Sequence, residues 1–167
     1  MLSESARMTT AAELRFRVQA PNSKTRATAV IALDPPGELV VRRLAEEAWN
    51  QAAFFKGPAA DPPGTPDADD GWMTTVGDSR TRVRDAVNAA DQVIMVASAG
   101  GHAAGAAVVG RACSLARVTT TSLIVGAGGA SDADVSKTLA QLRPWSLMVV
   151  IANNDDYVID MMTALRV

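Results

Sequence analysis

The chain has 167 residues, which is enough for one ordinary domain and too short for two. Hydrophobic residues make up 48% and charged residues 20%, a balance that excludes global disorder and predicts a buried core. Sixteen Lys and Arg against eighteen Asp and Glu give a net charge of -2. We therefore expect no nucleic-acid partner and no membrane partner, because both kinds of partner need a clustered basic face.

Rare residue types set further limits on the kinds of site that the chain can form. The single Cys113 excludes an intramolecular disulfide and a cysteine-based zinc cage, and the single His102 excludes sites that need two histidines. We therefore expect no metal site. Residues 1–17 contain no apolar core of a signal peptide, and no stretch approaches the ~18 apolar residues of a membrane span. The sequence predicts a cytoplasmic protein.

The first part of the chain predicts an arm followed by a strand and a helix. Residues 1–27 are interpreted as an N-terminal arm, in which the alternation of apolar and polar residues over 14–19 indicates an edge strand. The continuous apolar run at 28–33 is typical of a strand that is covered on both faces. Asp34 can cap a helix that has Pro35 in its first turn, with an apolar face that extends to Ala48 and Trp49.

The middle of the chain predicts one short strand, a loop and a second helix. Residues 53–55 are interpreted as a short strand. The segment 57–71 is rich in proline and glycine, which predicts a flexible surface loop rather than a linker between domains. Ser79 is predicted to cap a helix over residues 80–90.

Three more strands and three more helices are predicted in the second half. The strands are the runs at 92–97, 119–125 and 147–151. A small-residue helix is expected to end near Leu115, and Ser131 with Asp134 indicates a capping pair for a helix that ends near Leu142. Residues 153–156 cap the final helix. The alternation of strands and helices predicts an α/β fold, with a three-layer, Rossmann-like and mostly parallel sheet over residues 28–167.

Loops that follow parallel strands share one rim of the sheet, where ligands bind. The loops at 34–37, 98–105, 126–131 and 153–156 meet this condition. The most distinctive of them is the loop at 98–105, which we call the glycine loop. Its backbone N–H groups could hold an anion at a helix N-terminus. Its candidate ligand-binding residues are Ser98, Gly100, Gly101, His102 and Gly105. Two alternatives are that the small residues only let helix and sheet pack closely and that His102 faces solvent.

Further candidates for ligand binding follow the last two strands. Gly128 could contact the same ligand, and Asn153 or Asn154 could recognise a base edge through its amide group. Asp155 and Asp156 could hold a hard cation, although helix capping explains such residues as well. No acid partner for Ser98 or His102 is identifiable from spacing, so catalytic residues remain unknown, and Cys113 is interpreted as a core residue.

Several of these segments have counterparts in one family. The sequence AGGHAAGAA at residues 99–107 has glycines at Gly100, Gly101 and Gly105, and LMVVIANN at 147–154 ends in two asparagines. The two segments resemble the GGGTGTGAA phosphate loop and the TLIVIPND segment of the nucleotide-binding domain of the FtsZ/tubulin family. In that family the asparagine contacts guanine, and Asn153 aligns with it directly. The resemblance covers residues 28–167 in arrangement and implies a guanine nucleotide as the candidate ligand.

The sequence departs from the family pattern at points that bear on activity. Residues 34–37 replace the family's first glycine loop with two prolines, which lack N–H groups. The chain also ends where the family continues into the domain that completes GTP hydrolysis in the neighbouring subunit. The resemblance therefore implies no GTPase cycle and no filament of that kind.

Three functions remain open from the sequence. The first is a non-catalytic FtsZ-like domain that acts as a binding, regulatory or assembly protein, with weak or no nucleotide binding. The second is a protein or enzyme that binds a phosphorylated small molecule at the glycine-rich rim. The third is a structural component that binds a protein partner or forms a homo-oligomer, which exposed apolar surface at Trp49, Trp72 or residues 158–167 would favour.

Overall fold

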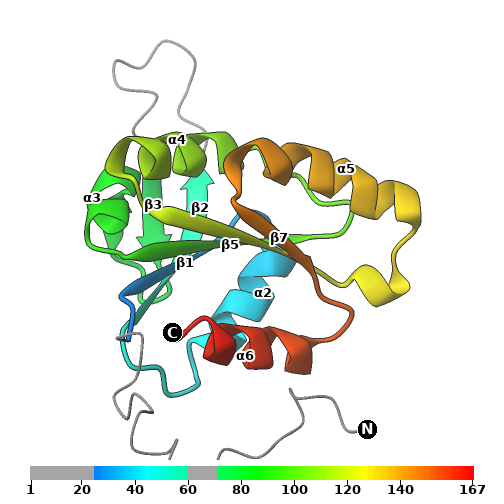
Figure 1. Cartoon of the computed structure of the whole chain (residues 1–167), viewed down its shortest axis with the longest axis horizontal. Helices are drawn as coiled ribbons and strands as arrows, with labels where there is room; N and C mark the ends of the chain where they lie inside the picture. Colours follow the sequence, from blue (N-terminus) through cyan, green and yellow to red (C-terminus); the bar gives the residue numbers. More distant parts are fainter. Residues whose placement is uncertain (1–24, 60–70) are drawn as a thin grey trace, which may run out of the picture.

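A single seven-stranded sheet forms the centre of the computed structural model, which describes residues 25–59 and 71–167 (Figure 1). The strand order is β4-β3-β2-β1-β5-β6-β7. The strands are β1 (Thr28–Ala32), β2 (Ala52–Ala59), β3 (Trp72–Thr75), β4 (Arg80–Arg82), β5 (Gln92–Ser98), β6 (Thr119–Val125) and β7 (Met148–Ile151). The helices are α2 (Pro35–Leu44), α3 (Val83–Asn88), α4 (Ala106–Ala116), α5 (Asp132–Leu142) and α6 (Asp155–Ala164), with short 3-10 helices η3 (Ala127–Gly129) and η4 (Arg143–Trp145).

Five neighbouring strands run parallel, namely β2, β1, β5, β6 and β7, and β3 and β4 extend the sheet as an antiparallel hairpin. The predicted α/β class and the mostly parallel sheet are confirmed. The four strands predicted from apolar or β-branched runs lie within one residue of their expected bounds. Their composition follows from their position, because a central parallel strand has helices on both faces and must be apolar on both.

Helices cover both faces of the sheet. In Figure 1, α3, α4 and α5 lie on one side of the strands and α2 and α6 lie on the other. Each side has its own core cluster, since Ile31 and Met95 pack with the α3–α5 helices while Val30 and Ile94 pack with α2 and α6. The alternation of side chains along β1 and β5 divides one apolar run between the two cores.

The hairpin corrects the prediction of a helix over residues 80–90. Residues Arg80–Arg82 form β4, and α3 begins only at Val83 with Arg82 as its N-cap, so Ser79 does not cap it. Instead, the Ser79 carbonyl accepts a hydrogen bond from the Thr75 N–H at 2.8 Å and closes the turn. The guanidinium groups of Arg80 and Arg82 lie 4.9 and 4.6 Å from the centre of the Trp72 ring, which stabilises the hairpin.

Two further expectations need correction, and one is not tested. Helix α2 ends at Leu44, and Trp49 lies beyond it, where its indole N–H donates to the Leu44 carbonyl at 2.7 Å. The loop expected over 57–71 starts too early, because β2 continues to Ala59. Residues 60–70 of this segment lie outside the described residues. The predicted N-terminal edge strand at 14–19 also lies outside them. In the described ranges, no helix has the length and apolar character needed to cross a membrane.

Candidate functional site

The main crevice lies where the direction of the strand order changes. From β1 the chain crosses through α2 to β2, and from β5 it crosses through α4 to β6 on the other side. The loops at the carboxyl ends of β1 and β5 therefore separate, and open α/β sheets bind ligands at this point. A cavity of about 650 Å³ lies there. Its lining residues are Leu33, Asp34, Pro35, Pro36, Ser98, Ala99, Gly100, Gly101, His102 and Asp134.

Asp34 connects the two loops. Its Oδ1 accepts from the Gly37 N–H at 2.8 Å and so caps α2, as the sequence predicts. Its Oδ2 accepts from the N–H of Ser98 at 2.8 Å and from the hydroxyl of the same residue at 2.7 Å. The Asp34 side chain is buried, with 8% of its surface exposed, so its carboxylate has three donors within the protein.

Gly101 lies directly against this carboxylate. A Cβ atom built on Gly101 would collide with Asp34 Oδ2 and would lie 2.6 Å from Ser98 Oγ and 2.9 Å from the Ser98 carbonyl oxygen. Glycine is required here because the space of its missing side chain is occupied by Asp34 and Ser98. The close approach is therefore between two parts of the protein itself.

Helix α5 holds the glycine loop from the other side. The Thr138 hydroxyl donates to the Ser98 carbonyl at 2.9 Å, and the Asp134 carbonyl accepts from the Gly100 N–H at 3.1 Å. Gln141 Oε1 accepts from the Ala103 N–H at 2.9 Å. These three residues share one face of α5, because their positions are separated by four and three residues.

Most N–H groups of the glycine loop donate hydrogen bonds within the protein. Gly101 donates to the Ser98 carbonyl at 3.0 Å, and Ala99 donates to the Val125 carbonyl at 3.0 Å. Of the six N–H groups from Ser98 to Ala103, only that of His102 has no acceptor in the part of the chain that the structure describes. The N–H groups of Ala104 and Gly105 also have no acceptor in the described residues, so three N–H groups of the loop at 98–105 remain unpaired there and five are donated within the protein.

The crevice is acidic in character. Asp34 and Asp134 contribute carboxylates, and neither lysine nor arginine is among its described lining residues. One cation lies beside the crevice, Lys137, whose ammonium group donates to the Gly100 carbonyl at 3.4 Å. His102 is exposed at the mouth of the crevice. Such a surface attracts cations and hydrogen-bond donors and repels phosphate.

The other predicted binding residues lie elsewhere on the rim. Gly105 is the N-cap of α4, and a Cβ added there would lie 3.0 Å from Pro58. Gly128 packs against the carbonyl of Asn153, beyond β6. Asn154 caps α6 by accepting from the Tyr157 N–H at 2.9 Å, which is the capping role that the sequence left open. The structure brings Ser98, Gly100, Gly101 and His102 together and leaves the rest outside the crevice.

The contacts from α5 to the glycine loop are the part of the site that the sequence does not predict. The sequence indicates Asp134 only as the capping partner of Ser131, and that contact is present, with the Ser131 hydroxyl donating to the Asp134 carboxylate at 2.7 Å. The sequence does contain a pattern that could have revealed this contact with the glycine loop. Asp134, Thr138 and Gln141 form a polar stripe along one face of a short helix. No group of acidic, histidine or cysteine residues that could hold a metal is found in the described ranges.

Cys113 lies on the buried face of α4. It is 1% exposed, and burial raises the pKa of its thiol from 9.0 to about 12. The native thiol thus stays protonated where the unfolded thiol ionises, so this group lowers stability as the pH rises from about 9 toward 12.

At pH 8 we expect a thiol reagent to label native protein slowly and urea-unfolded protein within minutes. Equally fast labelling of both forms would contradict the buried position.

Comparison of the sequence with protein-family models and with curated proteins gives no match. The function is therefore argued from the site.

Proposed function

We propose that the chain is a non-catalytic, FtsZ-like domain of three-layer, Rossmann-like architecture, which acts as a binding, regulatory or assembly protein and binds nucleotide weakly or not at all. The observation that carries the proposal is the position of the Asp34 carboxylate against Gly101. A phosphate placed at this loop would meet a buried negative charge instead of open backbone donors.

The hydrogen bonds of both loops support the same proposal. A phosphate site at a helix N-terminus needs several backbone N–H groups that point at the ligand. Between Ser98 and Ala103 only the His102 N–H is free of a described acceptor. In the first loop Pro35 and Pro36 have no N–H, and the Gly37 N–H is held by Asp34. The N–H groups of Ala104 and Gly105 also lack a described acceptor, so five of the eight loop N–H groups from Ser98 to Gly105 are unavailable to a triphosphate.

A second candidate function is binding of a small uncharged or cationic molecule. The cavity of about 650 Å³ has a size typical of ligand sites, and its two carboxylates favour a ligand that carries N–H or O–H donors. This replaces the phosphorylated ligand that the glycine-rich rim suggests from sequence, because phosphate lacks a cationic partner among the described lining residues.

A thermal-shift panel separates these functions. At 1 mM ligand and a dissociation constant near 1 mM, binding raises the free energy of unfolding by about 0.4 kcal/mol. We therefore expect GTP and sugar phosphates to raise the Tm by roughly 1–2 °C at most, with or without magnesium. A rise above 10 °C with GTP, or sustained GTP hydrolysis by the purified chain, would refute the proposal. A clear rise with a polyol or an amine, but not with any phosphate, would favour the second candidate.

A further inference from the structure

Exposed apolar side chains gather at one edge of the sheet. Leu147 is 81% exposed, and Met148, Ile151 and Tyr157 are each between 40% and 49% exposed. Three of the four lie in β7 or directly before it, and Tyr157 lies in the first turns of α6. We call these four residues the edge cluster. The tryptophans at 49 and 72, which the sequence suggested for such a surface, are half-buried instead.

Strand β7 leaves one side of its backbone unpaired. It pairs with β6 and with no other strand in the described ranges. Its sequence, Met-Val-Val-Ile, contains no charge and no proline. An apolar edge strand of this kind presents free N–H and C=O groups to any chain that can add a further strand.

The opposite edge of the same sheet is protected. Strand β4 has only three residues and carries Arg80 and Arg82, which lie over the Trp72 ring. Short length and positive charge are the usual features that prevent edge pairing. Strand β7 is also short, with four residues, but it carries no charge, and this distinguishes it from β4.

Both faces of the β7 edge are apolar. Val149 packs against the cluster under α4 and α5, and Val150 packs against the cluster over α2 and α6. Because side chains alternate along a strand, Ile151 shares the face of Val149, and Met148 shares the face of Val150. A strand added at this edge would bury apolar side chains on both faces.

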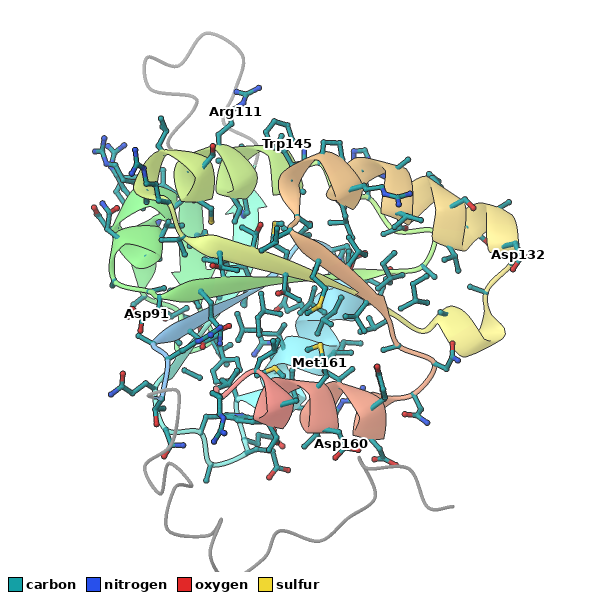
Figure 2. All side chains as sticks on the ribbon, in the orientation of Figure 1. Asp91, Arg111, Asp132, Trp145, Asp160 and Met161 are labelled. Carbon is teal, nitrogen blue, oxygen red and sulfur yellow. The ribbon has the colours of Figure 1, made fainter. Side chains whose placement is uncertain are left out.

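Helix α5 carries opposite charges at its two ends beside this edge. Asp134, Lys137 and Gln141 contact the loop after β5, which fixes the flank of α5 that faces away from β7. The helical repeat turns Asp132 and Arg143 toward the other flank, the one beside β7. Asp132 begins α5 and Arg143 follows its last residue, and Figure 2 shows Asp132 at the end of the helix remote from Trp145.

We propose that a second copy of this chain pairs with β7 in antiparallel orientation, about a two-fold axis perpendicular to the sheet. A two-fold axis places the same surface on both copies, so the edge cluster of each copy covers that of the other. The two α5 helices then run antiparallel on the same side of the joined sheet, and Asp132 of one copy lies beside Arg143 of the partner subunit. A parallel arrangement needs a two-fold axis along the strands, which would place the two α5 helices on opposite faces of the sheet and leave these charges without each other. The proposal goes beyond the proposed function and does not depend on the crevice.

Sedimentation velocity of the full chain over a range of concentrations tests the pairing. We expect a monomer–dimer equilibrium, whose dissociation constant rises by at least about tenfold in Ile151→Lys, because a charge on an edge strand opposes pairing. Leu39→Lys and Leu115→Lys are matched controls, since these exposed leucines lie on α2 and α4. We expect neither control to change the dissociation constant.

Charge reversal tests the antiparallel orientation. Asp132→Arg and Arg143→Asp should each weaken the dimer by about threefold to tenfold, because the axis repeats the contact twice. The double variant should restore the original affinity. Three results would overturn the proposal. They are a chain that remains monomeric at all concentrations, a dimer that Ile151→Lys leaves intact, and a double variant that dimerises no better than the single variants. Dimerisation that appears only after removal of residues 1–24 would also overturn it, since the edge would then be covered by the chain's own arm.

Discussion

Replacement of Gly101 by alanine or valine is expected to destabilise the fold by about 3 kcal/mol, since the new Cβ would occupy the space of the Asp34 carboxylate and of two Ser98 atoms. Neither neighbour can move cheaply, because Asp34 is buried and held by three hydrogen bonds. For a chain of this length the loss corresponds to a fall in Tm of about 6–12 °C.

The matched control for this change is Gly129→Ala. A Cβ at Gly129 meets no atom within 4 Å, so we expect a change within about 0.5 kcal/mol in urea unfolding. In an Asp34→Ala background, Gly101→Ala should cost less than it does alone, because the colliding oxygen has been removed. A Gly101→Ala protein as stable as the starting chain would show that the loop is open at this point.

Replacement of Asp34 by alanine is the second change with a large expected effect. It removes the cap of α2, which contributes about 1 kcal/mol, and it leaves the N–H and the hydroxyl of Ser98 without their acceptor. Because an unsatisfied buried donor costs about 1–3 kcal/mol, we expect a total loss of about 3 kcal/mol in urea unfolding.

Asn154→Ala is the matched control for the capping contribution. Asn154 also caps a helix, but its exposed side chain accepts only from the Tyr157 N–H, so we expect a loss of about 1 kcal/mol. Asp34→Asn should lie between the two, because the amide keeps one acceptor and turns its other end into a donor that faces the Ser98 N–H. Equal losses for Asp34→Ala and Asn154→Ala would mean that Asp34 is only a cap.

The parallel half of the fold could be predicted because local and tertiary signals agree there. The runs at β5 and β6 are apolar or β-branched, and turn or capping residues bound them, so strand, helix and order follow from the pattern. The hairpin β3–β4 could not be found in the same way. Its strands have four and three residues, and the contact that stabilises it joins Trp72 to arginines eight and ten residues later.

The site shows the same limit. Sequence spacing identifies the loop that contains Gly101 and the cap at Asp34, each from its own neighbours. Spacing does not reveal that the two meet, since the bond between Asp34 and Ser98 spans 64 residues and depends on β1 and β5 lying side by side. The glycine that sequence reasoning assigned to a phosphate is explained by this long-range contact.

Isothermal titration calorimetry of magnesium GTP into the full chain tests the closed loop most directly. The internal hydrogen bonds of the glycine loop and the Asp34 carboxylate predict a dissociation constant on the order of millimolar, or no binding heat. A dissociation constant of about 1 μM or lower for GTP would contradict the account, because it would require loop N–H groups that are donated within the protein to be available to phosphate.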